Sequence, residues 1–238
     1  MKSTILITGA NRGIGLALLR ELLARGDIVI AACRNPAASK ELQELEVRHP
    51  GVLTVVKLDV DSDYSVDFAA RHEIFAKIGA LDVIINNAAV FPEEGHESIE
   101  EINLAHFRVA FETNVMGVIH VTRTFLPLLE KGNNPRIVNI SSGAGSISDK
   151  KDFAYYAYST SKAALNMVTR AMAEELRRRK ITVVAISPGW VKTEMGGPDA
   201  PLTPEESARS LAKTIAGLSL KDTSSFLNRD GAANEYGW

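Results

Sequence analysis

Short apolar runs alternate with longer amphipathic stretches along most of the chain. The short runs are rich in β-branched residues, as in Val83-Ile84-Ile85, and their nearly continuous hydrophobicity predicts strands that helices cover on both faces. The alternation predicts repeated βαβ units and a mainly parallel sheet. The predicted strands are Thr4–Thr8, Ile28–Cys33, Val52–Leu58, Leu81–Asn86, Arg136–Ser141, Thr182–Ser187 and a short one at Ser225–Leu227.

The longer stretches carry apolar residues at the spacing of one helix face. Ile14, Leu18 and Leu22 form such a stripe, and Gly26 follows it as a stop signal. Capping residues are expected at Asp61, Ser62 and Thr203. The predicted helices are Gly13–Arg25, Pro36–Arg48, Ser62–Ile78, Ser98–Glu130, Tyr155–Arg179 and Thr203–Gly217. The fold class that follows is α/β, a three-layer sandwich with a seven-stranded, mostly parallel sheet.

Composition adds limits on domain number and partners. The 238 residues are 45% hydrophobic and 24% charged, and no linker or repeat divides them, so one domain over residues 1–238 is expected. A net charge of -2 provides no cationic field, so nucleic-acid binding is not expected. The single cysteine, Cys33, excludes an internal disulfide and favours a reducing, cytoplasmic setting.

Membrane, export and metal signals are weak. The longest stretch without Asp, Glu, Lys or Arg, Ile137–Ser148, is much shorter than the roughly 20 residues of a membrane span. The first apolar run breaks at Gly9 and Arg12, which argues against a signal peptide and for a chain that starts at Met1. The histidines form no short-spaced cluster with the cysteine, so no metal site is expected. Arg177–Lys180 is interpreted as a solvated helix end.

A glycine-rich segment joins the first strand to the first helix. Gly9, Gly13 and Gly15 follow Thr8 directly. Glycines at such a junction allow a tight turn and let a pyrophosphate approach the backbone, while the helix N-terminus offers unpaired N–H groups. The segment therefore predicts anion binding, with a purely structural turn as the alternative.

The end of the second strand bears on the choice of dinucleotide. An acid commonly binds the adenosine ribose there, whereas an arginine accommodates a 2'-phosphate. Here the strand ends in Cys33-Arg34-Asn35, and Arg12 in the glycine segment adds a second guanidinium. NADP(H) is therefore favoured over NAD(H); the alternative is that both arginines are solvated surface residues. Cys33 is interpreted as a small packing residue.

Tyr158 and Lys162 stand at positions i and i+4 of a predicted helix. This spacing puts a phenol and an ammonium on the same helix face, where they can act together. The spacing alone is weak evidence, because a surface pair would look the same.

Five features in this order resemble the motifs of the short-chain dehydrogenase/reductase family: Thr8–Gly15, Asn86–Ala89, Ser142, Tyr158–Lys162 and Pro188–Thr193. The resemblance covers essentially the whole chain and implies a Rossmann-type fold. Residues 226–238 resemble the C-factor-like carbonyl reductases in particular.

The resemblance implies four catalytic residues. Tyr158 would be the general acid in carbonyl reduction and the base in alcohol oxidation. Lys162 would lower the pKa of Tyr158 and bind the nicotinamide ribose. Ser142 would hold the substrate oxygen, with Ser141 as the alternative assignment. Asn114 would help to hold a water of the proton relay, and without the resemblance it reads as a buried polar helix residue.

The resemblance also assigns the cofactor site. Asp59 and Val60 would contact the adenine, the segment Asn86 to Ala88 would lie beside the adenine ribose, and Pro188 to Thr193 would meet the nicotinamide and pyrophosphate. The full set expected to bind the cofactor is Thr8, Gly9, Asn11, Arg12, Gly13, Ile14, Gly15, Arg34, Asp59, Val60, Asn86, Ala88, Tyr158, Lys162, Pro188, Gly189, Val191 and Thr193.

Two departures from the family pattern are visible. Ala89 stands where the family commonly has glycine, and this difference affects the expected cofactor geometry at that position. The spacing from Ser142 to Tyr158 is longer than usual and suggests an extended loop beside the substrate.

These observations lead to one functional hypothesis and one alternative. The hypothesis is an NADP(H)-dependent oxidoreductase acting on a small aldehyde, ketone or alcohol, in a homodimer or homotetramer formed through the helices at Ser98–Glu130 and Tyr155–Arg179. The alternative is a nucleotide-binding signalling or regulatory protein with incidental turnover. Glu194–Pro204 is expected to form a lid, but it has no charge pattern diagnostic of a substrate.

Overall fold

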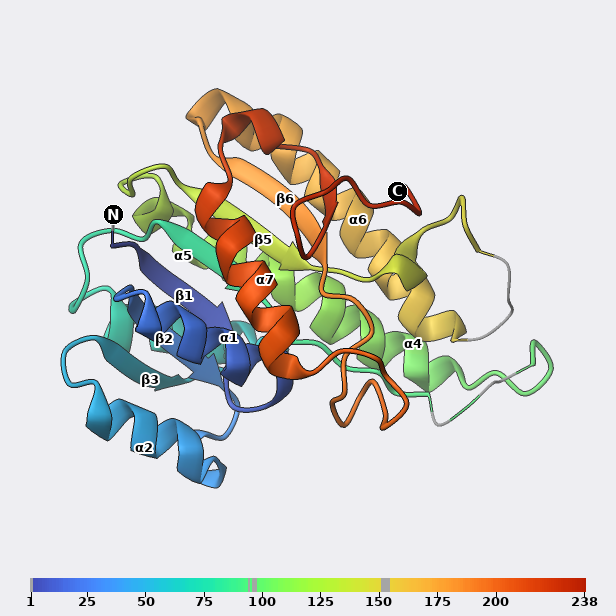
Figure 1. The fold of residues 1–238 in the computed structure, drawn as a ribbon, viewed down its shortest axis with the longest axis horizontal. Helices are drawn as coiled ribbons and strands as arrows, with labels where there is room; N and C mark the ends of the chain where they lie inside the picture. Colours follow the sequence, from blue (N-terminus) through green and yellow to red (C-terminus); the bar gives the residue numbers. More distant parts are fainter. Residues whose placement is uncertain (1, 94, 96–97, 151–154) are drawn as a thin grey trace.

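The computed structural model describes residues 2–93, 95, 98–150 and 155–238. Within these residues seven strands form one sheet in the order β3-β2-β1-β4-β5-β6-β7, and every neighbouring pair is parallel. The strands are β1 (Thr4–Thr8), β2 (Ile28–Cys33), β3 (Leu53–Lys57), β4 (Val83–Asn86), β5 (Arg136–Ile140), β6 (Thr182–Ser187) and β7 (Phe226–Asn228). The predicted α/β fold with a seven-stranded sheet is confirmed (Figure 1).

Helices cover both faces of this sheet. The α-helices are α1 (Gly13–Ala24), α2 (Lys40–Arg48), α3 (Asp63–Phe68), α4 (Leu104–Phe111), α5 (Gly117–Leu129), α6 (Tyr156–Leu176) and α7 (Pro204–Gly217). Side chains alternate across each strand, so Ile5 and Ile7 of β1 join the core beneath α1, α2 and α7, whereas Leu6 joins the core beneath α3, α5 and α6. Figure 1 shows the first group of helices in front of the sheet. The three-layer arrangement follows from this alternation.

Three predicted helices differ from the observed ones. The helix predicted over Pro36–Arg48 is a 3-10 turn, Pro36–Ala38, followed by α2, which Ser39 caps. The helix predicted from Ser98 begins only at Leu104, because the Asn103 side chain accepts a hydrogen bond from the backbone N–H of Ala105 and caps the helix there. A π-helical turn, Glu112–Met116, then separates α4 from α5. The helix predicted over Ser62–Ile78 is α3 followed by a π-helical segment, Ala69–Ile74.

Strand ends differ by one or two residues from the prediction. Leu81 was placed in the fourth strand because it is apolar, and it is indeed fully buried. Its backbone N–H, however, donates to the carbonyl oxygen of Leu128 in α5, and the ladder with β1 starts at Val83. The chain is therefore buried two residues before it pairs with β1. Hydrophobicity predicts which residues are buried but not where the strand begins.

The strand order reverses between β1 and β4, and the segments after these two strands are tied together. The hydroxyl of Thr8 accepts hydrogen bonds of 3.1 Å from the backbone N–H groups of Asn87 and Ala88. The Asn87 side chain donates to the carbonyl oxygens of Thr8 and Gly9. Ligands of open α/β sheets bind at such a reversal, outside the carboxyl ends of the strands.

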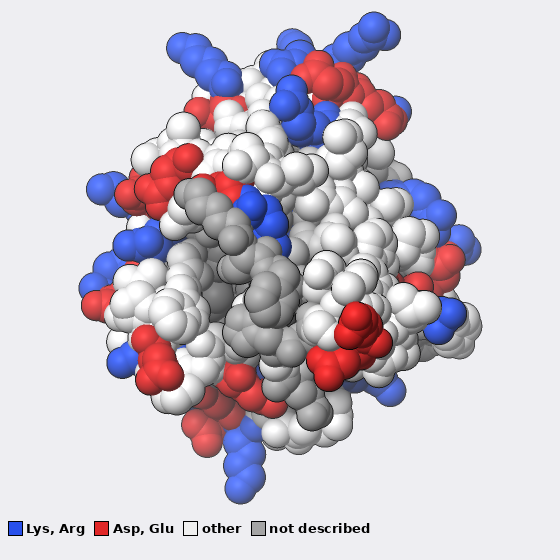
Figure 2. Space-filling model, turned by 90° about the vertical axis from the view of Figure 1, so that its right-hand side faces the viewer, with Lys and Arg blue, Asp and Glu red and all other residues white. Residues whose placement is uncertain are grey.

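The surface carries both signs of charge. Figure 2 shows acidic and basic side chains interspersed around one face, with uncharged surface between them. The helices formed by the described residues include none with the length and hydropathy that a membrane span requires.

Candidate active site

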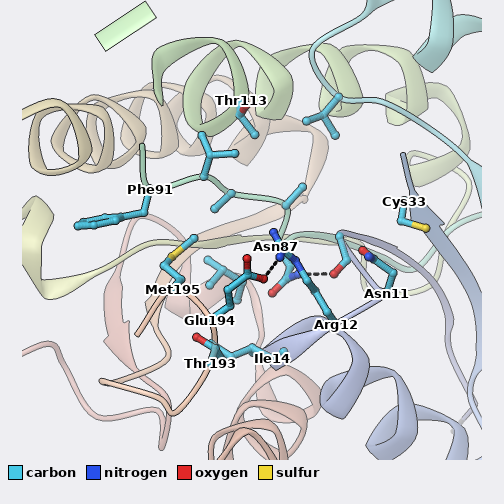
Figure 3. Close-up of a pocket in the computed structure, with 18 of the residues that line it drawn as sticks. Asn11, Arg12, Ile14, Cys33, Asn87, Phe91, Thr113, Thr193, Glu194 and Met195 are labelled. Carbon is cyan, nitrogen blue, oxygen red and sulfur yellow. Dashed lines mark hydrogen bonds and ion pairs between the residues drawn. The ribbon is translucent and has the colours of Figure 1, made fainter. Parts of the chain in front are cut away.

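A cleft of about 1110 Å³ runs along the carboxyl ends of the strands. Figure 3 shows Cys33 toward one side of it and Phe91 toward the other, with Arg12, Asn87 and Glu194 between them. The sequence-predicted residues that line it are Gly9, Asn11, Arg12, Gly13, Ile14, Gly15, Arg34, Asp59, Val60, Ala88, Tyr158, Lys162, Pro188 and Thr193. The predicted residues that are not part of its lining are Thr8, Asn86, Asn114, Ser142, Gly189 and Val191.

The glycine segment is shaped by its own packing. Gly9 has a φ of +66°, and a Cβ at this position would lie 2.9 Å from the Cα of Ala88. A Cβ at Gly15 would collide with the carbonyl oxygen of Gly9. Within the described part of the chain, no side chain caps the N-terminus of α1. The first N–H groups of α1 therefore face the cleft with the positive end of the helix dipole, which suits an anionic group.

Asn86 and Asn87 have different surroundings. Asn86 is buried and donates a hydrogen bond of 2.8 Å to the side chain of Asn139 in β5, so it holds the core rather than lining the cleft. Asn87 lines the cleft beside Ala88. β4 ends at Asn86, so Asn86 still has the surroundings of a strand residue in the core, whereas Asn87 begins the segment that follows the strand.

Acidic and basic groups meet where β2 and β3 end. Burial raises the pKa of Asp61, while the hydrogen bond from Thr113 and the charge of the exposed Arg34 act in the opposite direction. One Asp61 oxygen accepts a hydrogen bond of 2.9 Å from the Thr113 hydroxyl. The other is buried and has no hydrogen-bond partner within the described residues. Asp61 also lines the cleft, and sequence reasoning missed it although it follows Asp59-Val60 directly.

Cys33 lies beside this group. The thiol is buried, and burial raises its pKa, which suits a packing residue rather than a nucleophile.

An ion pair bridges the middle of the cleft. The Arg12 guanidinium, from the glycine segment, bonds to the carboxylate of Glu194, from the loop after β6 (Figure 3). Both side chains are well exposed, at 61% and 79%. Arg12 is thus already partnered by a carboxylate that the sequence analysis did not pair with it.

The loop after β6 is held in place by hydrogen bonds and buried side chains. The carbonyl oxygen of Pro188 accepts a hydrogen bond of 2.7 Å from Ser207 in α7. Val191 is buried and pairs with Leu202 in an isolated parallel bridge. Gly189 has a φ of +83°, a conformation that favours glycine, and Thr193, four residues later, lines the cleft.

Tyr158, Ser142 and Lys162 lie together at the carboxyl end of β5. Tyr158 is half-buried in the first turn of α6, and Lys162 is only 2% exposed one turn later. The Lys162 Nζ lies 5.7 Å from the centre of the Tyr158 ring and donates a hydrogen bond of 2.9 Å to the carbonyl oxygen of Ile140. Burial lowers the pKa of Lys162 to about 8.

The pKa of Tyr158 corrects one expectation. Lys162 was expected to lower it, but in this structure the pKa of Tyr158 is raised. Burial is the main cause, and the charge of Glu93 adds to it, while a hydrogen bond with Ser142 acts in the opposite direction. The ammonium of Lys162 donates to a backbone oxygen, that of Ile140, and the largest influence on the phenol is burial.

Asn114 stands in the π-helical turn between α4 and α5. It is 1% exposed, accepts a hydrogen bond from the backbone N–H of Val90, and donates to the carbonyl oxygen of Val90 and to the hydroxyl of Ser161. Asn114 therefore ties the segment after β4 to α6. π-Turns of this kind occur often at functional sites.

Residues 91–93 form a contact with Tyr158 that sequence reasoning missed. The Phe91 ring meets the rings of Tyr155 and Tyr158 edge-on, with centroids 4.9 and 5.0 Å apart. The carboxylate of Glu93 is buried against the start of α6. No spacing rule links these residues to α6, because the contact crosses more than 60 positions of the chain.

The C-terminal residues fasten the loop that follows Ser142. The carbonyl oxygen of Tyr236 accepts hydrogen bonds from the Ser146 and Ser148 hydroxyls, at 2.5 and 2.8 Å. The Tyr236 ring also fills the space where a Cβ at Gly143 would lie. The extended loop predicted between Ser142 and Tyr158 includes residues 151–154, which lie outside the described residues.

No group of three or more His, Cys, Asp or Glu side chains suited to a metal ion is found among the described residues.

Known proteins that are similar to this chain agree on its family. The family model for short chain dehydrogenases matches residues 3–201. The NADPH-bound carbonyl reductase from chicken fatty liver is 36% identical, with a TM-score of 0.91 over 100% of this chain and 99% of its own. The carbonyl reductase Sniffer of D. melanogaster is 32% identical, with a TM-score of 0.93 over 100% of both chains. The C-signal protein of Myxococcus xanthus is 37% identical over 153 residues, which are 64% of this chain and 91% of that protein.

Proposed function

Because the chain belongs to the short-chain dehydrogenase family and is an oxidoreductase of that family, we propose that it is an NADP(H)-dependent reductase of small aldehydes or ketones. The observation that carries the proposal is the position of Tyr158. Its phenol lines the same cleft as the glycine segment, next to Ser142 and Lys162. The candidate proton donor and the candidate anion-binding segment therefore share one cavity.

The lining of the cleft fits a dinucleotide. The N–H groups at the start of α1 would meet the pyrophosphate, and Arg12 and Arg34 would meet a 2'-phosphate. Asp59 and Val60 line the part of the cleft where the adenine would lie, and Thr193 lines the wall near Gly13. When bound, the cofactor supplies or accepts the hydride.

The residues of this chain manage the proton. The Tyr158 hydroxyl is protonated at neutral pH, which is the form that donates to a carbonyl oxygen, and burial raises its pKa further. In our proposal Ser142 holds that oxygen, and Lys162 binds the nicotinamide ribose. Asn114 holds the backbone of Val90 next to the cleft and supports the relay that returns a proton to Tyr158. The reverse reaction would use the Tyr158 phenolate as the base.

The similarity to two carbonyl reductases, one of them described with NADPH bound, supports this choice of reaction and cofactor. The test is a panel of aldehydes and ketones assayed for NADPH oxidation, with Tyr158→Phe as the control. We expect turnover by the wild type on at least one member of the panel and almost none by the variant.

The similarity to C-signal favours a second candidate, a nucleotide-binding signalling or regulatory protein. The same panel separates the two candidates. Tight cofactor binding without turnover of any carbonyl compound would support the regulatory function and contradict the reductase.

We propose that the protein forms a homodimer, or a tetramer built from such dimers, through α4, α5 and α6. Large apolar side chains are exposed on this part of the chain, namely Leu104, Val109, Met116 and Met167. Light scattering at micromolar concentration should give at least twice the mass of one chain, and a strictly monomeric protein would contradict the proposal.

A further inference from the structure

Glu93 reaches from the segment after β4 to the N-terminus of α6. Its carboxylate accepts a hydrogen bond of 2.6 Å from the backbone N–H of Ala157 and two of 3.2 Å from the backbone N–H of Tyr158. Tyr155, the N-cap residue of α6, provides no side-chain cap and has a φ of 59°. The free N–H groups at the start of α6 are therefore satisfied by an acid more than 60 positions earlier in the chain.

The location of this carboxylate is unusual for a helix cap. Glu93 is only 4% exposed, yet it lines the cleft that also holds the phenol of Tyr158. Both of its carboxylate oxygens accept a hydrogen bond from the backbone N–H of Tyr158 itself. Two residues earlier, Phe91 packs edge-on against the Tyr158 ring. A single short segment thus contacts both the backbone and the ring of the proposed proton donor.

We propose that Glu93 is a positioning residue for Tyr158: it fixes the first turn of α6, and its negative charge adds to the burial that favours the protonated phenol, the form that reduces carbonyl groups. The inference rests on the proposed function only for the role of the phenol. The contact between Glu93 and Tyr158 is independent of it. A charge in a partly buried site acts more strongly than one in water, so removal of the Glu93 charge should ease loss of the phenol proton.

Other groups near Tyr158 act on the same proton. Ser142, after β5, lowers the pKa of Tyr158 through a hydrogen bond, while Glu93 raises it. Lys162, on α6, is directed to Ile140. Further charged or titratable groups in the surrounding elements are Lys150, which donates to Ser159, Tyr155 in the cleft wall, and Lys192 and Glu194 after β6. Of the described carboxylates, Glu93 is the one that touches the backbone of Tyr158.

The Glu93→Gln variant distinguishes the effect of the charge from the effect of the helix cap. Glutamine has no charge, but it keeps an acceptor oxygen and nearly the same shape. The rate of NADPH-dependent carbonyl reduction should fall off at a pH lower by about half to one unit than in the wild type. The low-pH limb of alcohol oxidation should shift in the same direction, because oxidation needs the phenolate. A uniform loss of rate with an unchanged pH profile would mean a purely structural role and would overturn the proposal.

Glu206→Gln is the matched control. Glu206 also caps a helix, α7, by accepting a hydrogen bond of 2.9 Å from the backbone N–H of Thr203, but it lies outside the cleft lining. This variant should leave the pH profile unchanged. Glu93→Asp keeps the charge on a shorter side chain, so it should lower the maximal rate while the pH profile stays close to that of the wild type.

A direct titration keeps this test separate from the proposed function. Protein labelled with ¹³C at the tyrosine ring carbon next to oxygen reports phenol ionisation by NMR, and Tyr158→Phe identifies the Tyr158 signal. The ionisation midpoint of Tyr158 should be lower in Glu93→Gln than in the wild type even if no carbonyl substrate is found. Equal midpoints would overturn the role of the charge, whereas absence of turnover with shifted midpoints would count only against the reductase.

Discussion

Nζ of Lys162 donates a hydrogen bond of 2.9 Å to the backbone oxygen of Ile140. The side chain is 2% exposed, and its pKa falls to about 8 because burial disfavours the ammonium form. The lysine most closely associated with the proposed chemistry is therefore also a source of instability.

Replacement of Lys162 by Met should stabilise the protein at neutral pH. The pKa of an unfolded lysine is about 10.4, so between about pH 8 and 10.4 the unfolded state binds more protons than the folded state. The free energy of unfolding of the wild type should therefore rise with pH across this window relative to that of Lys162→Met. We expect the variant to be more stable by about 1 to 3 kcal/mol at pH 7, partly offset by loss of the Ile140 hydrogen bond.

Denaturant unfolding at several pH values measures this difference. Lys213→Met, at an exposed position of α7, is the control for the loss of one lysine. A difference between wild type and Lys162→Met that stays constant from pH 7 to 10 would contradict the assigned pKa.

Tyr158 and Lys162 should separate catalysis from cofactor binding. Tyr158→Phe removes the proton donor but keeps the ring that packs against Phe91, so turnover should fall by at least 100-fold while NADPH affinity stays within a few-fold. Lys162→Ala should reduce both. Fluorescence titration of NADPH beside steady-state rates gives the two quantities, and an equal loss of NADPH affinity in both variants would contradict the separate roles.

Hydrophobic periodicity was sufficient to place all seven strands, because a parallel sheet covered on both faces leaves continuous apolar runs in the sequence. It was not sufficient for the start of α4, where a single side chain, Asn103, decides which residue begins the helix. The part of the cleft at Gly9 and Gly15 was predictable, because the need for glycine there arises within a short stretch of the sequence. Glu93 was not predictable, because its carboxylate reaches the N–H groups at the start of α6 only when α6 has packed beside the segment after β4.

The sign of the pKa shift at Tyr158 could not be inferred from sequence either. The i, i+4 spacing puts Lys162 on the same helix face but does not show where its Nζ points. The carbonyl oxygen of Ile140 takes that hydrogen bond, and the acid that does influence the phenol comes from another segment.

Arg34 should govern the choice between NADPH and NADH. A charge-assisted contact to the 2'-phosphate is worth roughly 1.5 to 3 kcal/mol, which is at least tenfold in affinity. Arg34→Asp should therefore weaken the binding of NADPH by at least tenfold. The affinity for NADH should stay unchanged or rise slightly, because an aspartate can accept hydrogen bonds from the free ribose. Parallel titrations test this, and a wild type that binds NADH as tightly as NADPH would show that the arginines are wrongly assigned.

The ion pair between Arg12 and Glu194 should temper that preference. The Glu194 carboxylate is bound to the same guanidinium that a 2'-phosphate would contact. The affinity gained from the 2'-phosphate is therefore reduced by the loss of the ion pair. Exposed ion pairs contribute about 0.2 to 1 kcal/mol, so Glu194→Gln should tighten NADPH by about 1.5- to 5-fold and change NADH little. The effect should shrink at high salt. In an Arg12→Ala background the same substitution should have no effect on NADPH affinity. If Glu194→Gln instead weakens both cofactors equally, the pair acts as a clamp that closes the loop after β6 over the cleft, and competition for Arg12 is excluded.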